Sequence, residues 1–586
     1  MTLVANVKVG AHDVKYEDIT VGDILDAALN DYVYAGNYGI KGDGSDESAA
    51  LVALLQSKQG ATIDFQGLVV TVANSVSATL SQATRILNLT LVSAQPSASA
   101  YTLRVYTSST LVIENINIDA AAKSAKAVWL VATADTAKLV LRGDNVIANA
   151  LESTGTGLAA GLYAGADSTY TWDSIYITDT TRVRDVQSSG GSNVGRGVLL
   201  QNFKHCNVTG LDVRRVGPYQ DGDGIYVASP NFVDAVAVIS DCYFEDCQKR
   251  GVKSQVMASR VSNITVRRTQ AFTTGPGQSD VDLQAGGSLD GLTCFYAAGA
   301  APQSVVAGGF VSGGTTLKGV SLRNIDVNCD STTEVIPRLV SLFNNSSNAY
   351  DGYLVEGLKC NCLCRNVLYM YSNVGNSGGA YIFQRVEVRD VTASGFYADT
   401  DTAVVQISRG TSQPVKATVL LENIKVGTGS SVERVYLDPA PGTTTLLDVQ
   451  IQRILNCVGF KQDSSANTSA TARVHVQTLD AAENAAVDLV VPVSVTGYRS
   501  VLKVLGTYNS SRDTSANKLF TEGYAFALAD GSLQYIESTA GVKTSTNTGS
   551  ISILSAGSSI VLRKTAGSTS AGGRLQLLLL HEGNTY

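Results

Sequence analysis

The sequence predicts an all-β protein in which a solenoid of stacked parallel strands is followed by an antiparallel β-sandwich. Two features favour this fold class: strand patterns that recur about every 24–35 residues, and a composition that is poor in helix-forming residues. Charged residues make up 16% of the 586 residues, against about 25% in ordinary globular chains, and glycine contributes 55 residues. Such a composition is typical of many short strands joined by turns.

The clearest helix signal follows Asp46, a residue that can cap a helix N-terminus. Apolar Leu51, Leu54 and Leu55 then recur at helical spacing. Gly60 suits the position just after a helix end, where a left-handed backbone is common. We therefore expect a helix between Asp46 and Gly60, followed directly by the first strand of the solenoid.

A four-residue unit, asparagine followed by apolar residues in alternation, recurs through the middle of the chain. It begins at Asn115, Asn263, Asn324 and Asn423. We expect its isoleucine and valine side chains to stack inside the coils and its asparagines to hydrogen-bond along the stack. Hairpin signals every 8–12 residues, which an antiparallel sandwich requires, are rare in this region. The pattern therefore predicts a solenoid.

Regular apolar–polar alternation of a different kind begins after residue 467. Asp530-Gly531 lies between two such strands and is a strong hairpin signal. The last part of the chain is therefore expected to form a separate antiparallel sandwich. The expected divisions are a short N-terminal attachment segment at 1–35, the helix-capped start of the solenoid at 36–84, the solenoid itself at 85–460 and the sandwich at 468–586.

Nine cysteines are spread along the chain, and only Cys360, Cys362 and Cys364 lie close together. On a strand these three side chains would point to one face. A structural zinc site needs a cage of four nitrogen or sulfur ligands, and no histidine lies near them in the sequence. We expect buried thiols there, and neither a metal nor a cofactor.

The net charge of −7 argues against a nucleic-acid partner, because such partners are bound largely through their phosphates. No run of 18 apolar residues is present, and the first ten residues lack the apolar core of a signal peptide. We therefore expect neither membrane insertion nor secretion through a signal peptide, and synthesis in a cytoplasm.

The segment Tyr38–Leu51, which reads YGIKGDGSDESAAL, resembles the opening of pectate-lyase-like right-handed β-helix proteins. It is especially similar to that of bacteriophage tailspikes and capsular polysaccharide depolymerases. With the coil pattern, the resemblance covers about residues 36–457. The sequence departs from the family pattern in one place: Phe65-Gln66-Gly67 stands where the family has Pro-Gly-x-Tyr. The resemblance implies a right-handed parallel β-helix and a homotrimer at a virion tail.

The same resemblance implies a function at the bacterial surface: binding and depolymerising host capsular or O-antigen polysaccharide. Only about 35 residues precede the motif, so we expect attachment through a tail adaptor or a sister tailspike. The protein would be made in the host cytoplasm. Two alternatives stay open, a polysaccharide lyase on the same fold and a fibre that binds its receptor without cleaving it.

Basic residues concentrate between Arg182 and Arg268, where 12 Lys or Arg accompany 8 Asp or Glu. A positive stretch on an acidic chain suits an anionic polysaccharide, which arginine can bind in a bidentate manner. The alternative is a solvated face of paired charges. All of the candidate site residues except Asp282 lie within this stretch.

Asp223 and Asp246 are 23 residues apart, about one coil, so we expect them to lie one strand above the other. Two carboxylates that close have different pKa values and could act as acid and base in glycosidic cleavage. The alternative role for each is a turn or a solvated corner. The expected catalytic residues are Asp223, Glu245, Asp246 and Asp221, and the expected substrate-binding residues are Tyr219, Tyr226, Arg250, Lys253 and Asp282.

Asp223-Gly224-Ile225 and Glu245-Asp246-Cys247 also resemble two motifs of polygalacturonases. Tyr226 stands where that family has a further aspartate, and the Gly-His-Gly motif of that family is absent. We therefore do not expect pectin to be the substrate.

Overall fold

The computed structural model describes residues 32–582 with gaps, and two compact units divide the chain at residues 1–212 and 213–586. The gaps within the described range are residues 97, 154–156, 167–168, 190–193, 218–220, 230–232, 273–277, 310–316, 345–349, 373–382, 397–402, 410–414, 427–432, 439–446, 456–471, 481–485, 493–500, 511–517, 528–532, 540–549, 557–558 and 567–572.

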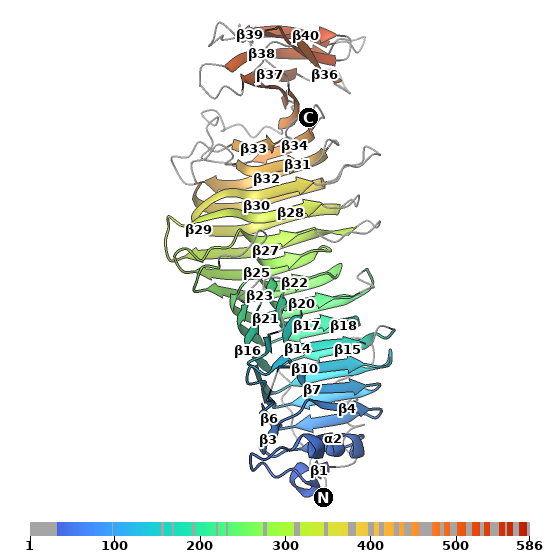
Figure 1. Ribbon diagram of the computed structural model, residues 1–586. Coiled ribbons are helices and arrows are strands. Elements are labelled where there is room, and N and C mark those ends of the chain that lie inside the picture. Colours follow the sequence, from blue (N-terminus) through green and yellow to red (C-terminus); the bar gives the residue numbers. More distant parts are fainter. Residues whose placement is uncertain are drawn as a thin grey trace, which may run out of the picture. The chain divides into compact units, whose positions relative to one another are not determined.

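The first unit is a parallel solenoid in which each coil contributes one strand to each of three sheets (Figure 1). The first sheet contains β1 (Tyr32–Tyr34), β2 (Thr62–Asp64), β5 (Thr84–Leu87), β8 (Thr110–Glu114), β11 (Lys138–Arg142), β15 (Trp172–Ile177) and β18 (Phe203–Thr209). The second contains β3 (Val69–Val72), β6 (Thr90–Ser93), β9 (Asn117–Asp119), β12 (Asp144–Ala148), β13 (Leu151–Glu152) and β16 (Thr180–Ser188). The third contains β4 (Val76–Leu80), β7 (Ser99–Thr107), β10 (Ser124–Ala132), β14 (Leu158–Ala166) and β17 (Val194–Gln201), while β19 (Leu211–Gly217) crosses the boundary between the units.

Apolar side chains in register form the core of this unit. One buried column of the first sheet consists of Ile63, Ile86, Ile113, Leu141, Ile177 and Val208. Successive members are 23, 27, 28, 36 and 31 residues apart in the chain. Coils of unequal length therefore keep one core in register; between the first two coils the four extra residues lengthen the third-sheet strand, from the 5 residues of β4 to the 9 of β7.

The helix expected near the start is present as α2 (Ser48–Ser57), after the short 3-10 helix η1 (Ala35–Tyr38). Leu51, Leu54 and Leu55 are buried, as their spacing predicts. The carboxylate of Asp46 accepts the backbone N–H of Ser48 at 3.0 Å and so satisfies a donor at the helix start. The helix packs on β4 of the first coil.

In the second unit each solenoid coil has one long and one short strand. The long-strand sheet contains β21 (Val236–Cys247), β23 (Ala258–Arg268), β25 (Gly287–Tyr296), β27 (Leu317–Cys329), the first part of β29 (Tyr350–Ser372), β30 (Phe383–Phe396), β32 (Val415–Val426) and β34 (Leu447–Leu455). The short-strand sheet contains β20 (Asp221–Ala228), β22 (Arg250–Ser254), β24 (Ser279–Leu283), β26 (Ser304–Gly308), β28 (Val335–Asn344), the last part of β29, β31 (Ala403–Arg409) and β33 (Glu433–Asp438). All of these pairings are parallel.

Three of the four recurring asparagines, Asn263, Asn324 and Asn423, form left-handed corners within the long strands, where the chain bends. Their φ angles are 50–55°, a conformation that asparagine tolerates better than most residues. Each also donates from Nδ2 to an aspartate Oδ1 of the preceding coil: Asn263 to Asp241 at 3.1 Å, Asn324 to Asp290 at 2.7 Å and Asn423 to Asp390 at 2.9 Å. The expected hydrogen bonding along the stack is confirmed at these corners, and the apolar residues that follow are buried.

Replacement of Asn324 by alanine is expected to lower the free energy of unfolding by about 1–3 kcal/mol, because alanine is strained at positive φ and lacks the amide donor. Asn324→Gly keeps the backbone conformation and removes only the hydrogen bond, so its loss should be smaller. Thermal and denaturant unfolding of the two variants measure this difference. Equal losses would contradict a role for the left-handed backbone.

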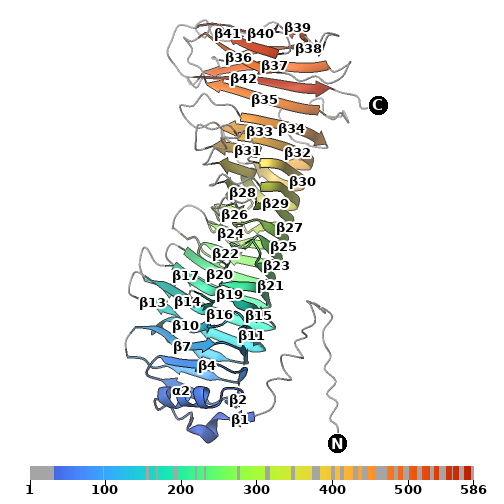
Figure 2. The same ribbon diagram turned by 90° about the vertical axis from the view of Figure 1, so that its right-hand side faces the viewer.

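Two antiparallel sheets that share one core form the C-terminal sandwich (Figure 2). The larger sheet contains β35 (Ala472–Asp480), β42 (Gly573–Glu582), β37 (Val501–Ser510), β38 (Lys518–Ala527) and β39 (Leu533–Thr539). The smaller contains β36 (Val487–Pro492), β41 (Ser559–Lys564) and β40 (Ile551–Ala556). Strands β38 and β39 pair antiparallel, as the Asp-Gly signal between them predicts. Strands β37 and β41 were not expected from the sequence pattern.

The all-β parallel β-helix predicted from the sequence is confirmed, whereas the homotrimer stays a prediction. Cys360, Cys362 and Cys364 are buried thiols, as expected. Among the residues that the structure describes, no helix has the length and hydropathy needed to cross a membrane.

Candidate functional site

Three carboxylates meet at one guanidinium group on the short-strand sheet. Arg250 Nη1 lies 3.5 Å from Asp221 Oδ1 and 3.2 Å from Asp223 Oδ1. Arg250 Nε donates to Asp282 Oδ2 at 2.8 Å. Because β22 lies between β20 and β24, Arg250 can reach acids on both neighbouring strands. Lys249 adds a second cation through its ion pair with Asp221. We call these five residues the acid cluster.

The members of the acid cluster differ in their access to solvent. The side chains of Asp223 and Asp282 are 0% and 1% exposed, that of Arg250 is 8% exposed and that of Asp221 is 22% exposed. Burial by itself lowers the pKa of Arg250, but the carboxylates of Asp223, Asp282 and Asp221 outweigh it and raise that pKa above its usual value. Arg250 therefore carries a permanent charge at the centre of the acids, and Asp221 is the acid most open to solvent.

A chain of hydrogen bonds joins the acid cluster to Tyr226. The hydroxyl of Tyr226 donates to Gln255 Oε1 at 2.5 Å, Gln255 Nε2 donates to Gln284 Oε1 at 2.7 Å, and Gln284 Nε2 donates to Asp282 Oδ2 at 2.9 Å. Lys253 Nζ lies 4.4 Å from the centroid of the Tyr226 ring. Tyr226, Lys253, Arg250 and Asp282 thus lie together, and their role in binding a substrate stays a prediction.

A fully buried ion pair supports the backbone that enters β22. Arg268 Nε donates to Asp280 Oδ1 at 2.7 Å. The same guanidinium donates to the backbone carbonyls of Cys247, Gln248 and Lys249, each at 3.2 Å. Sequence reasoning counted Arg268 only as part of the basic stretch, because no motif spacing marks an arginine and an acid that meet inside the fold.

The expected stacking of Asp223 on Asp246 is wrong. Asp223 pairs in register with Arg250, 27 residues later, whereas Asp246 ends β21 in the long-strand sheet. Asp246 has a φ of 51° and accepts the N–H and the hydroxyl of Thr269 at 2.8 and 2.6 Å. Its side chain therefore stabilises a corner of the coil. The coil spans 27 residues from Asp223 to Arg250, four more than the 23 that separate Asp223 from Asp246. Arg250, and not Asp246, therefore lies opposite Asp223.

Glu245 likewise belongs to the long-strand sheet and lies apart from the acid cluster in the strand order. It accepts the hydroxyl of Tyr243 at 2.5 Å and lies 3.9 Å from Arg214 Nη1. Burial, together with this hydrogen bond to Glu245, raises the pKa of Tyr243 above its usual value. Glu245 is therefore not the partner of Asp223. Tyr219, also expected at the site, lies outside the described residues.

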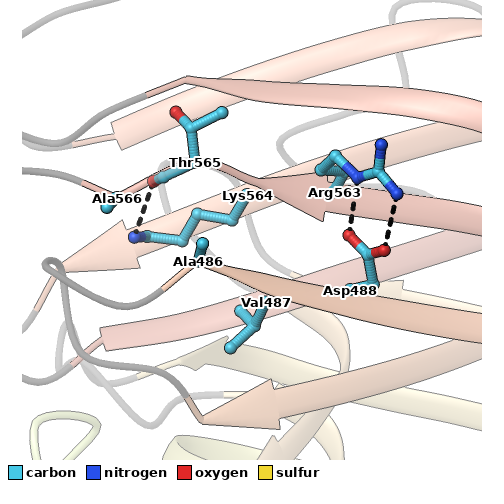
Figure 3. A pocket seen from close by; sticks show the side chains of 7 residues that line it. All are labelled: Ala486, Val487, Asp488, Arg563, Lys564, Thr565 and Ala566. Atoms are coloured by element: carbon cyan, nitrogen blue, oxygen red, sulfur yellow. Dashed lines mark hydrogen bonds and ion pairs between the residues drawn. The ribbon is translucent and has the colours of Figure 1, made fainter.

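A pocket of about 410 Å³ on the sandwich, between β36 and β41, offers less for chemistry (Figure 3). Arg563 donates to both carboxylate oxygens of Asp488, at 2.9 and 2.8 Å, and this lowers the pKa of Asp488. Lys564 Nζ donates to the carbonyl of Thr565 at 3.1 Å. The only acid that lines this pocket is thus held as an ion by its neighbour.

Within the described part of the chain, no group of three or more histidine, cysteine, aspartate or glutamate side chains could hold a metal ion. The acid cluster consists of carboxylates around a guanidinium. It can exchange protons with a ligand at Asp221 and bind polar groups along Tyr226 and Lys253.

The site and fold together define a parallel β-helix with acidic and basic side chains on one outer sheet. No protein-family model and no curated protein matches the chain. It is similar to solved phage tailspike structures. The tailspike of Acinetobacter phage vB_ApiP_P1 is 11% identical with a TM-score of 0.24, and the match covers 94% of this chain and 87% of that one.

The chain is also similar to two further solved structures of phage tailspikes. A tailspike of Acinetobacter baumannii bacteriophage Fri1, described as a capsular polysaccharide depolymerase, is 12% identical with a TM-score of 0.26; the match covers 94% of this chain and 86% of that one. The tailspike of bacteriophage AP22, solved with a capsular saccharide, is 10% identical with a TM-score of 0.24; the match covers 96% and 98%. Because these identities and TM-scores are low, the assignment of the fold rests on the strand register of this chain and not on its likeness to these structures.

Proposed function

We propose that this protein binds a bacterial surface polysaccharide, capsule or O-antigen, on its short-strand sheet and cleaves it by hydrolysis at the acid cluster. One observation carries the proposal: Asp221 is partly open to solvent while two buried acids and two cations surround it. Glycosidic cleavage needs a carboxyl group whose protonation is set by its neighbours. The proposal also includes a homotrimer, located at a virion tail and attached through an adaptor or a sister spike. These parts of it rest on the resemblance of the Tyr38–Leu51 motif to tailspikes.

In this proposal Asp221 is the catalytic residue, because it is the acid in the cluster that a polymer can reach. Asp223 and Asp282 act through Arg250, whose position they determine, and so are positioning residues. Tyr226 offers a ring and a hydroxyl to a sugar, and Lys253 lies beside it. Glu245 and Asp246 have no role at this cluster.

The arrangement favours hydrolysis over elimination. A lyase needs a cation that neutralises the carboxylate of a uronic acid next to the proton that is removed. Arg250 is already bound by three carboxylates of the protein, and Lys249 is paired with Asp221. Neither cation of the cluster is therefore available for a uronate at the cleavage point.

The test is to incubate the protein with a panel of purified capsular and O-antigen polysaccharides and to follow viscosity, reducing ends and ultraviolet absorption. We expect viscosity to fall for at least one polymer, with new saturated reducing ends. Ultraviolet-absorbing unsaturated products would replace the hydrolase by a lyase. Tight binding with unchanged viscosity would identify a non-catalytic receptor-binding fibre and contradict the enzyme proposal.

A further inference from the structure

One row of side chains on the outer face of the short-strand sheet continues beyond the acid cluster. The residues of this row alternate along their strands with core residues such as Val252, Val281 and Val340. Tyr226 is partly exposed, and the other six residues of the row are at most 8% exposed. In register from strand to strand, the row consists of Tyr226, Lys253, Asp282, Ala307, Ser341, Tyr369 and Gln406.

An arginine and three aromatic side chains lie at the far end of this row. The guanidinium carbon of Arg338 lies 3.5 Å from the centroid of the Tyr369 ring, a close cation–π contact. The rings of Tyr369 and Tyr371 stack with centroids 6.3 Å apart, and the Phe343 ring meets them edge-on at 6.3 and 6.1 Å. We call these four residues the aromatic cluster.

Arg338 differs in its partners from three other arginines of this unit. Arg250, Arg268 and Arg323 each form an ion pair with at least one carboxylate. No aspartate or glutamate among the described residues forms an ion pair with Arg338, which is only partly exposed. Burial lowers the pKa of Arg338; Tyr369 offsets part of this, and the like charge of Arg365 adds to it. A positive charge is thus held against a tyrosine ring in a side chain that is partly exposed.

The spacing of this row suits a polymer. Three strand steps separate Asp282 on β24 from Tyr369 on β29, which is about 14 Å at about 4.8 Å per step. The two residues between them in the row, Ala307 and Ser341, are small. Asp282 and Tyr369 are themselves 1% and 8% exposed, so a polysaccharide chain that runs from strand to strand would contact the two clusters through their partly exposed members, Asp221 and Arg338.

We infer that Arg338 and Tyr369 form a binding site for the carboxylate of an acidic sugar, so that the polymer carries uronic acids or similar units. Arginine binds carboxylates through two parallel hydrogen bonds, and the buried Tyr369 ring holds the guanidinium of Arg338 in place. The site lies away from the acid cluster, so the charged unit need not be the one that is cleaved. This inference rests on the proposed function to the extent that the polymer lies on this sheet.

The experiment measures binding in the full chain with Asp221→Asn, which is expected to reduce turnover at least about 100-fold. The probes are hyaluronate, polygalacturonate and polysialate, their carboxyl-reduced forms, and neutral dextran. We expect at least one acidic polymer to bind. Arg338→Gln should weaken that binding at least about tenfold, carboxyl reduction of the polymer should do the same, and Arg338→Lys should retain part of the affinity. The matched control is Arg323→Gln on the long-strand sheet, which should leave affinity unchanged.

Equal affinity of the Arg338→Gln variant, in a chain with unchanged melting temperature, would overturn the inference. Binding of dextran or of carboxyl-reduced polymer as tight as that of the acidic form, or no binding of any acidic polymer, would also overturn it. The proposed function fails separately. If the unmodified chain cleaves no polysaccharide while binding still depends on Arg338, then only the enzyme proposal is lost.

Discussion

Replacement of Asp221 by asparagine is expected to reduce polysaccharide turnover at least about 100-fold, the usual contribution of a positioned acid or base. Asparagine has nearly the shape of aspartate but can neither give up nor take a proton at the reacting oxygen. Arg250 keeps Asp223 and Asp282 as partners, so the melting temperature should stay close to that of the unmodified chain. Reducing-end release and thermal unfolding measure the two quantities.

Two variants make this test specific. Asp223→Asn removes a negative charge close to Asp221, which lowers the pKa of Asp221 and moves the acid limb of the pH–activity profile to lower pH. Asp326→Asn removes an exposed carboxylate from β27 of the long-strand sheet and should leave activity unchanged. Normal turnover by the Asp221 variant, or equal loss in the Asp326 control, would place the reaction elsewhere.

Replacement of Arg250 by methionine is expected to lower the free energy of unfolding by about 3–5 kcal/mol at neutral pH. The change leaves Asp223 and Asp282 as buried carboxylates without their shared cation, with Asp221 nearby. Removing one partner of a buried pair is costly because the remaining charge has neither water nor a counter-ion. Thermal and denaturant unfolding at matched pH provide the measurement.

The sign of the pH dependence gives an independent check. In the folded Arg250→Met variant, Asp223 and Asp282 no longer lie beside a guanidinium group, whose pKa their charges raise in the unmodified chain. Their own pKa values therefore rise above the unfolded values near 4. Protonation then favours the folded state, and the stability deficit should shrink as the pH falls toward these raised values. Arg323→Met, which breaks an exposed pair with Glu356, should cost less than about 1 kcal/mol at any pH. A deficit that does not change with pH would contradict this account of the cluster.

The fold was predictable because its signals are local. An asparagine that tolerates positive φ, followed by alternating apolar residues, marks a corner and the buried strand after it, as at Asn324 and Asn423. The helix before Gly60 is likewise encoded within one short segment. Each of these signals needs only neighbouring residues and no knowledge of loop length.

The site was predictable only in part, because it depends on which residues of two coils lie opposite each other. Asp221, Asp223, Arg250 and Asp282 were identified as candidates, and the structure brings them together. The partner assigned to Asp223 was wrong because this coil is four residues longer than the assumed 23, so Arg250 and not Asp246 lies opposite Asp223. Loop length is invisible to a periodicity argument, so a pairing across coils cannot be read from average spacing.

Unequal coils that keep one register have a consequence for how such a chain can diversify. Each layer hydrogen-bonds only to the layers next to it, and 23–36 residues fill one layer of the first unit without disturbing its column of aliphatic side chains. Insertions and deletions at the layer edges therefore leave folding largely intact while they change the surface met by a ligand. A lineage of such proteins whose ligand changes can therefore alter the residues at the edge of one layer at a time.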